Sequence, residues 1–168
     1  MKILITGGGG FIGSHVVERA LQQGHEVVVL DDFSTATTSN LKSVETNQSL
    51  KIVQGSILDQ ELVEDLVSEV DGCFHLAAAL GVERIMERPL QSLAVNLQGS
   101  ENVLNACARS NVRTVLSSSS EIYGKTTDFP ISEESDRVIG SPLKWRWMYS
   151  EAKALDESIA SVLHHQQG

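Results

Sequence analysis

Short apolar runs alternate with longer amphipathic segments along the whole chain. The short runs are rich in valine, isoleucine and leucine, a pattern typical of strands buried on both faces of a parallel sheet. They predict strands at residues 2–6, 26–30, 51–55, 72–76 and 112–116. The segments between them carry apolar residues at helical spacing. They predict helices at residues 11–23, 60–67, 89–110 and 145–165. Because strand and helix alternate, the expected fold class is α/β, a doubly wound parallel sheet flanked by helices.

Four consecutive glycines, residues 7–10, stand between the first predicted strand and the first predicted helix. A diphosphate bound at a helix N-terminus needs backbone N–H groups with no Cβ in the way, and φ values that glycine adopts at low cost. Two registers meet this need: Gly8, Gly10 and Gly13 as G-x-G-x-x-G, or Gly7, Gly10 and Gly13 as G-x-x-G-x-x-G. Either register predicts a dinucleotide-binding loop in a Rossmann-type fold.

Asp31 and Asp32 follow the second predicted strand. An acidic side chain at the end of this strand can accept hydrogen bonds from both ribose hydroxyls of an adenosine, and it repels the 2′-phosphate of NADP. An aspartate pair also caps turns, and taken alone the pattern is equally compatible with that role. Together with the glycine loop, the pair indicates NAD as the cofactor.

The composition narrows the choice of partners. The chain has 168 residues, enough for one domain, and a formal net charge of −9. Such a charge disfavours a nucleic-acid or anionic-membrane partner and favours a small-molecule substrate. Cys73 and Cys107 lack C-x-x-C spacing and a neighbouring histidine cluster, so free buried thiols are expected and no metal site is predicted. The chain begins directly with a strand and contains no long apolar run, which leads us to expect a cytoplasmic protein.

Tyr149 and Lys153 are the main catalytic candidates. They lie four residues apart in the last predicted helix, which puts both side chains on one face. A lysine ammonium near the phenol, together with the positive ring of oxidised NAD, would lower the tyrosine pKa and make it a base. Ser119, after the fifth predicted strand, can hold the same substrate oxygen while NAD takes a hydride. A tyrosine and a lysine at this spacing also occur by chance, so the pair indicates an active site only in combination with the glycine loop.

Other polar residues have simpler explanations beside the functional ones. His75 ends a predicted strand, where a lone histidine is more often packed or hydrogen-bonded than catalytic. The serines at 117–120 resemble a linker, but a buried strand precedes them and an Ile-Tyr-Gly segment follows. Ala77 and Ala78 would let a cofactor approach the backbone, although alanines are also ordinary packing residues. Asn96 is an unusual polar residue in an amphipathic helix.

These motifs together resemble the extended short-chain dehydrogenase/reductases that act on nucleotide sugars. Residues 6–13, TGGGGFIG, are similar to the T-G-x-x-G-F-I-G of that family, and Tyr149-x-x-x-Lys153 is similar to its active-site pair. Residues 118–124, SSSEIYG, resemble the S-T-S-E-V-Y-G of UDP-glucuronate decarboxylases and sugar 4,6-dehydratases more than the version in UDP-galactose 4-epimerases. The segment from Arg146 to Ser150 also resembles the decarboxylase-like branch.

The resemblance implies transient oxidation of a UDP-linked sugar at C4, with the hydride returned after epimerisation, decarboxylation or dehydration. The catalytic residues it implies, with Glu121 as an added acid/base group, are Ser119, Glu121, Tyr149 and Lys153. With the glycine loop and the aspartate pair, the expected cofactor contacts are Gly7, Gly10, Phe11, Ile12, Gly13, Asp31, Asp32, Ser34, Ile57, Ala77, Ala78, Asn96, Tyr149 and Lys153. Ser56 stands where the family usually has an aspartate near the adenine. Glu121 is also explicable as a solvated surface charge.

Family members continue beyond the last predicted helix into further strands and a small domain that holds the sugar nucleotide. Residues 1–168 are therefore expected to be an incomplete NAD-binding Rossmann domain that lacks the last strands and the C-terminal substrate domain. An unfinished sheet would expose an apolar edge. The resemblance implies a homodimer formed by the helices at 89–110 and 145–165. The alternatives are a non-catalytic dinucleotide-binding module, an ordinary NAD-dependent dehydrogenase, or a dehydratase.

Overall fold

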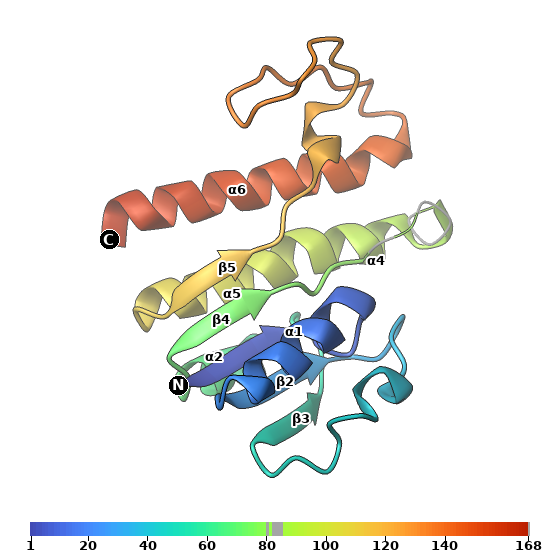
Figure 1. The fold of residues 1–168 in the computed structure, drawn as a ribbon. Helices are drawn as coiled ribbons and strands as arrows, with labels where there is room; N and C mark the ends of the chain where they lie inside the picture. Colours follow the sequence, from blue (N-terminus) through green and yellow to red (C-terminus); the bar gives the residue numbers. More distant parts are fainter. Residues whose placement is uncertain (80, 82–85, 168) are drawn as a thin grey trace.

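A computed structural model describes residues 1–79, 81 and 86–167, and its centre is a parallel sheet of five strands. The strand order is β3-β2-β1-β4-β5 (Figure 1). This order confirms the predicted Rossmann-type α/β class. The strands are β1 (Lys2–Thr6), β2 (Glu26–Asp31), β3 (Leu50–Gln54), β4 (Gly72–His75) and β5 (Arg113–Leu116).

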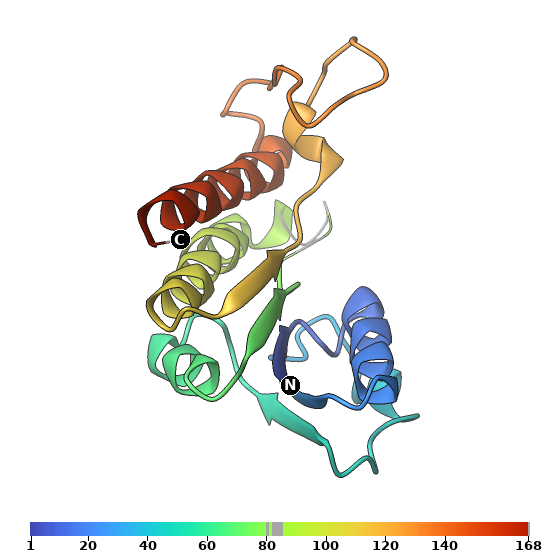
Figure 2. The same ribbon diagram turned by 60° about the vertical axis from the view of Figure 1, so that its left-hand side comes forward.

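Helices cover the two faces of the sheet (Figure 2). Helix α1 packs on one face, while α2 and α5 pack together on the other. Helix α6 packs on α5 and extends that layer past β5 (Figure 1). The helices are α1 (Phe11–Gln22), α2 (Gln60–Val67), α4 (Pro89–Ala94), α5 (Ser100–Arg109) and α6 (Met148–Gln167).

Alternating side chains of the central strands belong to two separate hydrophobic cores, one on each face of the sheet. Leu4 and Val28 point toward α2 and α5, whereas Ile3, Ile5 and Val29 point toward α1. Both faces are therefore buried, which explains why the strands are apolar throughout instead of alternating with polar residues.

The predicted helix over 89–110 is interrupted. A π-helical turn, η2 (Val95–Gly99), joins α4 to α5. Such a turn carries wider i→i+5 hydrogen bonds, which apolar periodicity does not reveal. The last predicted helix likewise begins with a separate 3₁₀ turn, η4 (Trp145–Trp147), before α6. Short 3₁₀ turns also form at η1 (Thr38–Leu41), inside the polar segment that follows β2, and at η3 (Ser120–Tyr123), which follows β5.

Two predicted helix ends are confirmed in detail. The Asp59 side chain caps α2 by accepting a hydrogen bond from the Leu62 N–H at 3.1 Å. Gly24 follows α1 with φ +81°, a value that favours glycine at the end of a helix.

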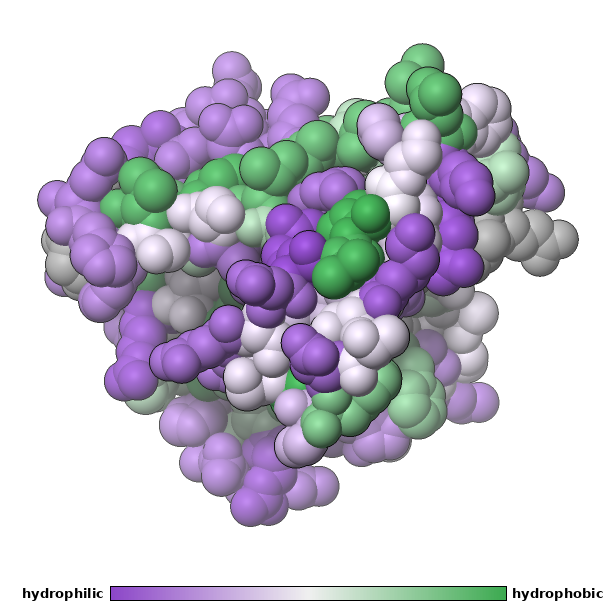
Figure 3. All heavy atoms as spheres, turned by 90° about the horizontal axis from the view of Figure 1, so that it is seen from above, coloured by the Kyte–Doolittle hydropathy of each residue, from purple (hydrophilic) through white to green (hydrophobic). Residues whose placement is uncertain are grey.

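The outer strand β5 leaves apolar surface exposed. Val115 in this strand is 50% exposed. Seen from above, hydrophobic residues also form patches among hydrophilic ones on the face that carries α6 and the preceding loop (Figure 3). Across the described residues, no helix is both long enough and apolar enough to cross a membrane.

The Asp59 cap gives a test of local stability. We expect Asp59→Ala to lower the free energy of unfolding by about 1 kcal/mol, because the N–H groups at the start of α2 lose a side-chain acceptor. Urea unfolding monitored by circular dichroism measures this change. Asp65→Ala, on the exposed side of the same helix, is the matched control and should change stability by less than about 0.5 kcal/mol. Equal losses in the two variants would contradict a capping role.

Candidate active site

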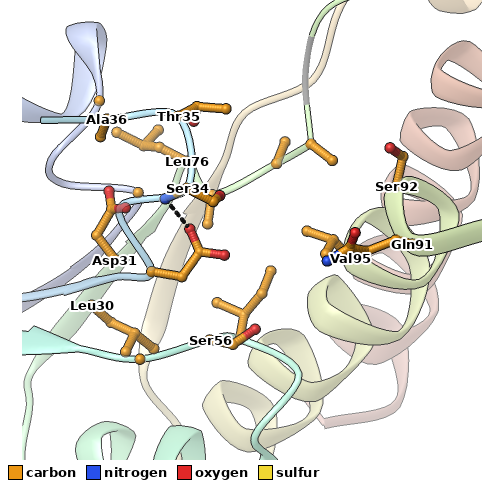
Figure 4. Close-up of a pocket in the computed structure, with 18 residues that line it drawn as sticks. Leu30, Asp31, Ser34, Thr35, Ala36, Ser56, Leu76, Gln91, Ser92 and Val95 are labelled. Carbon is orange, nitrogen blue, oxygen red and sulfur yellow. Dashed lines mark hydrogen bonds between the residues drawn. The ribbon is translucent and has the colours of Figure 1, made fainter. Parts of the chain in front are cut away.

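A cleft opens at the carboxyl ends of four of the five strands (Figure 4). The chain crosses from β3 to the other side of β1 to form β4, so the strand order reverses direction between β1 and β4. Ligands of open α/β sheets bind at such a switch point. The residues that line the cleft come from the end of β2, from the loops after β1, β2, β3 and β4, and from α4 and η2: Gly7, Gly10, Leu30, Asp31, Asp32, Ser34, Thr35, Ala36, Gly55, Ser56, Ile57, Leu76, Ala77, Ala78, Ala79, Gln91, Ser92 and Val95.

The glycine loop forms one wall of the cleft and distinguishes the two possible registers. Gly7 has φ +71°, and a Cβ there would lie 2.7 Å from the Ala77 nitrogen. A Cβ on Gly13 would lie 2.1 Å from the Gly7 carbonyl oxygen, so α1 can cross the strand end only with glycine at this position. Gly7 and Gly10 line the cleft, whereas Gly8 is buried against Val29. The geometry therefore favours the register of Gly7, Gly10 and Gly13.

The start of α1 suits an anionic group. No side chain caps this helix end. The first N–H groups of a helix have no intrahelical acceptor, and the helix dipole adds positive potential at this end. The side chains of Phe11 and Ile12 are 80% and 67% exposed and line a separate apolar groove on α1. Their side chains thus lie outside the cleft, and any contact with a cofactor there would have to come from their backbone.

Asp31 is held firmly at the end of β2. Its Oδ2 accepts a hydrogen bond from the Gly9 N–H and its Oδ1 accepts one from the Phe33 N–H, both at 2.8 Å. Each carboxylate oxygen keeps a further lone pair that can accept from a ribose hydroxyl. Asp32 lines the same wall, and its Oδ1 accepts from the Ser34 N–H at 2.8 Å (Figure 4).

Asn40 was not expected from the sequence to matter at this site. Its Nδ2 donates to the Gly9 carbonyl oxygen at 2.9 Å. Since Asp31 accepts from the Gly9 N–H, two side chains hold both polar groups of one loop residue. The only sequence feature that could have suggested this role is an amide side chain in an otherwise Ser/Thr-rich segment.

The remaining walls agree in part with the predicted contacts. Ile57, Ala77 and Ala78 line the cleft, as does Ser56, whose Oγ accepts from the Leu58 N–H at 3.2 Å. Asn96 is not among the described residues that line the cleft.

Asn96 lies in the π turn and binds the backbone of Ala79, accepting from its N–H at 2.7 Å and donating to its carbonyl at 3.1 Å. Asn96 therefore fixes the backbone of the segment after β4. Gln91, Ser92 and Val95 instead face the cleft from the side opposite Asp31 (Figure 4), which the sequence did not suggest.

The four proposed catalytic residues come from two elements that pack together. Turn η3, which carries Glu121, packs on α6, which carries Tyr149 and Lys153. Ser119 precedes the turn, and its Oγ accepts from the Glu121 N–H at 3.2 Å. Glu121 is exposed, while Tyr149 is half-buried and close enough to Glu121 to feel its charge.

Lys153 is buried and forms an ion pair within α6. It is 1% exposed, and its Nζ donates to Asp156 Oδ2 at 3.1 Å. The pKa of Tyr149 is raised above its ordinary value by burial first, and then by the negative charges of Glu121 and Asp156. In this structure the ammonium of Lys153 is paired with Asp156.

His75 is fully buried, as the simpler explanation of the sequence predicted. Its two ring nitrogens bond Thr6 Oγ1 at 2.7 Å and Ser100 Oγ at 3.1 Å. Burial, and secondarily the charge of Lys153, lowers the pKa of His75 to about 3, so the ring is neutral at physiological pH. Cys73 and Cys107 are buried free thiols, also as predicted.

Comparison with known proteins identifies the class. Residues 3–168 match the NAD dependent epimerase/dehydratase family, and the chain belongs to this family. The resemblance inferred from the glycine loop and the Tyr-Lys pair is confirmed, and NAD is the cofactor of the family.

Three relatives illustrate the similarity. The UDP-N-acetyl-alpha-D-glucosaminuronate decarboxylase of Bacillus cytotoxicus is 39% identical over 158 residues, covering 94% of this chain and 48% of that protein. The UDP-glucose 4-epimerase of Thermotoga maritima, solved with UDP-glucose, has a TM-score of 0.87 at 31% identity and covers 100% of this chain and 52% of that one. The dTDP-glucose 4,6-dehydratase of Streptomyces venezuelae, solved with NAD bound, also has a TM-score of 0.87 at 31% identity, covering 98% of this chain and 52% of that one.

The chain thus spans about half the length of these relatives. All three are named as enzymes, which favours an enzyme over a non-catalytic dinucleotide-binding module.

Gly13 provides a test of the cleft. We expect Gly13→Ala to weaken NAD binding by at least about tenfold, or about 1.4 kcal/mol, because the new Cβ pushes α1 away from the loop. Isothermal titration calorimetry with NAD measures the dissociation constant. Gly72→Ala is the control, since a Cβ on Gly72 would meet its nearest atom at an ordinary 3.6 Å. Undiminished NAD binding by folded Gly13→Ala protein would contradict the importance of this close approach.

Proposed function

We propose that the protein is an NAD-dependent nucleotide-sugar epimerase or decarboxylase that oxidises its sugar transiently at C4. The observation that carries this proposal is the packing of η3 on α6, with Glu121 of η3 close enough for its charge to act on the phenol of Tyr149. Each of these groups can hold or move a proton, and Lys153 adds a buried ammonium to the same helix.

The residues of the cleft fit NAD. The uncapped start of α1 offers N–H groups to a diphosphate, and Asp31 presents a fixed carboxylate to a ribose. When bound, NAD supplies a hydride acceptor that returns the hydride within the same turnover. The negative charges of Asp31 and Asp32 oppose the 2′-phosphate of NADP. We assign cofactor contacts to the residues predicted from the sequence, with Asn96 acting through the Ala79 backbone instead of directly.

We assign the chemical roles as follows. Tyr149 removes the proton of the sugar hydroxyl, and Ser119 holds the same oxygen by a hydrogen bond. Glu121, exposed at the start of η3, is the additional acid/base group. Lys153 supplies positive charge that favours the phenolate once the positive ring of the cofactor is also present.

A UDP-linked sugar such as UDP-glucuronate or UDP-glucose is the proposed substrate. The support is the substrates in the names of two relatives, a UDP-N-acetyl-alpha-D-glucosaminuronate decarboxylase and a UDP-glucose 4-epimerase, together with the SSSEIYG segment. Residues 1–168 would serve as the NAD-binding domain, and the sugar nucleotide would be held by parts of the protein outside these residues.

Product analysis tests the proposal directly. Incubation of the full-length protein with NAD and either UDP-glucuronate or UDP-glucose, followed by NMR of the products, should show an epimerised or decarboxylated sugar without accumulation of NADH. We expect Tyr149→Phe to lower kcat by about 10²- to 10⁴-fold, because the proton can no longer be transferred by the phenol.

Tyr123→Phe, which changes the chain's other tyrosine, is the matched control and should keep its activity. Unchanged sugars in the presence of bound NAD would rule out both substrates. Steady release of NADH would point to an ordinary dehydrogenase.

We also propose a homodimer in the cytoplasm. The support for a dimer is apolar surface on helices that extend beyond the sheet: Leu90 on α4 is 80% exposed, and Leu155 and Val162 on α6 are 48% and 52% exposed. The two free cysteines agree with a reducing compartment. We expect sedimentation equilibrium to give twice the monomer mass, and Leu155→Glu to give a monomer because a charge would be buried at the interface. A monomeric wild-type protein would contradict the dimer.

A further inference from the structure

A chain of buried hydrogen bonds runs from the cofactor cleft to the lysine of the active site. Thr6 and His75 are register partners at the ends of β1 and β4, and their side chains bond each other. His75 continues to Ser100 at the start of α5, and Ser100 Oγ donates to Asp156 Oδ2 on α6 at 3.1 Å. Asp156 accepts from Lys153 through the same oxygen. Thr6, His75, Ser100 and Asp156 are each 0% exposed.

Counting donors and acceptors fixes the direction of every bond in this chain. Asp156, as a carboxylate, only accepts, so the Ser100 hydroxyl proton points to Asp156. The Ser100 oxygen must then accept from His75, which places the ring proton on Nε2 and leaves Nδ1 as an acceptor. Thr6 therefore donates to Nδ1, and Thr6 Oγ1 accepts from the Ala77 N–H at 3.2 Å. Ala77 lines the cofactor cleft.

Asp156 is costly to bury, which suggests that it is retained for a purpose. Burial raises the pKa of Asp156, while the Lys153 ammonium and the Ser100 hydroxyl act in the opposite direction. Its second oxygen, Oδ1, has no hydrogen-bond partner among the described residues. Replacing a buried ion pair by apolar residues often leaves a protein as stable as before or more stable. The ion pair of Lys153 and Asp156 is therefore weak evidence for a stabilising role.

The charges around Tyr149 show what the pair does to the site. Glu121 from η3 and Asp156 from α6 both act on the phenol with negative charge. The positive charge available on the same helix face, that of Lys153, is bonded to Asp156. His75, the titratable group facing Lys153 from β4, is neutral. The surroundings of the phenol therefore disfavour the phenolate.

Resting on the proposed function, we propose that Asp156 is a positioning residue that keeps Tyr149 protonated until oxidised NAD is bound. As the buried counter-ion of Lys153, anchored through Ser100, His75 and Thr6, it fixes the ammonium and offsets its charge at the phenol while the cofactor is absent. The positive ring of the cofactor then completes the conditions for deprotonation. The base is thus active only when a hydride acceptor is present beside it.

Titration of Tyr149 tests this role without any turnover. Near-ultraviolet absorbance reports phenolate formation, and subtraction of the Tyr149→Phe titration removes the contribution of Tyr123, the only other tyrosine. We expect Asp156→Asn to lower the pKa of Tyr149 in the NAD-free protein, because one negative charge is lost and the Lys153 ammonium is released. In the wild-type protein, NAD should lower the same pKa, and NADH, which lacks the ring charge, should lower it less.

Glu157→Gln is the matched control. It removes the same charge one residue further along α6, where the carboxylate is exposed and contacts Ser118. Solvent and salt screen this charge, so the pKa of Tyr149 should not change. An unchanged or raised Tyr149 pKa in Asp156→Asn, or an equal shift in Glu157→Gln, would overturn the role of Asp156. A wild-type pKa that NAD leaves unaltered would overturn its dependence on the cofactor.

A second measurement keeps the proposal testable if Asp156→Asn does not fold. Nitrogen-15 NMR of wild-type protein should show His75 neutral, with its proton on Nε2, throughout pH 5 to 8, a range that spans the ordinary histidine pKa of about 6.5. A proton on Nδ1, or titration of His75 in this range, would contradict the direction of the chain. Because neither titration nor NMR needs a sugar substrate, loss of the proposed activity would leave both results interpretable.

Discussion

The close approach of α1 to the end of β1 is the contact on which the rest of the site depends. A Cβ on Gly13 would lie 2.1 Å from the Gly7 carbonyl oxygen, so no larger residue permits the crossing. The approach directs the uncapped start of α1 toward the strand ends. It also places Gly7 against the backbone of Ala77, which joins the glycine loop to the segment after β4. The glycine loop can therefore form one wall of the cleft because its residues have no side chains.

Hydrogen bonds from side chains to the backbone hold the other walls of the cleft. Asp31 and Asn40 bind the two backbone groups of Gly9, and Asn96 binds both backbone groups of Ala79. These bonds satisfy polar backbone groups that secondary structure does not pair, and they fix loops that would otherwise have several conformations. The chain from Thr6 to Lys153 extends the same arrangement to α6. Binding of a cofactor and the state of the catalytic base would then be linked through one set of buried bonds.

Residues next to each other in sequence were the easiest to interpret. The glycine loop, the strand that follows it and the Asp59 cap depend on contacts within a few positions, and the structure agrees with each of them. The Tyr149 and Lys153 pair was also visible, because i, i+4 spacing fixes a shared helix face. The surroundings of Lys153 were not visible in the sequence, because Asp156, the ion-pair partner of Lys153, had no recognised role there. The π turn before Ser100 was equally hidden, since apolar spacing in the helix does not report a wider hydrogen bond.

The sequence by itself determined the α/β class, the dinucleotide loop, the preference for NAD and the family. The first three rest on local chemistry: apolar runs, glycines that accept positive φ or close approach, and an acidic side chain after a strand. The family rests on the resemblance of residues 6–13, of 118–124 and of the Tyr149 and Lys153 pair to its motifs. Only the tertiary structure decided the hydrogen bonds of Asn96 to the Ala79 backbone and the neutral state of His75. Those features join residues that are far apart along the chain: Thr6 and His75 are separated by 69 positions, His75 and Ser100 by 25, and Ser100 and Asp156 by 56. No periodicity connects such positions, because their contact follows from how the sheet and the helices pack.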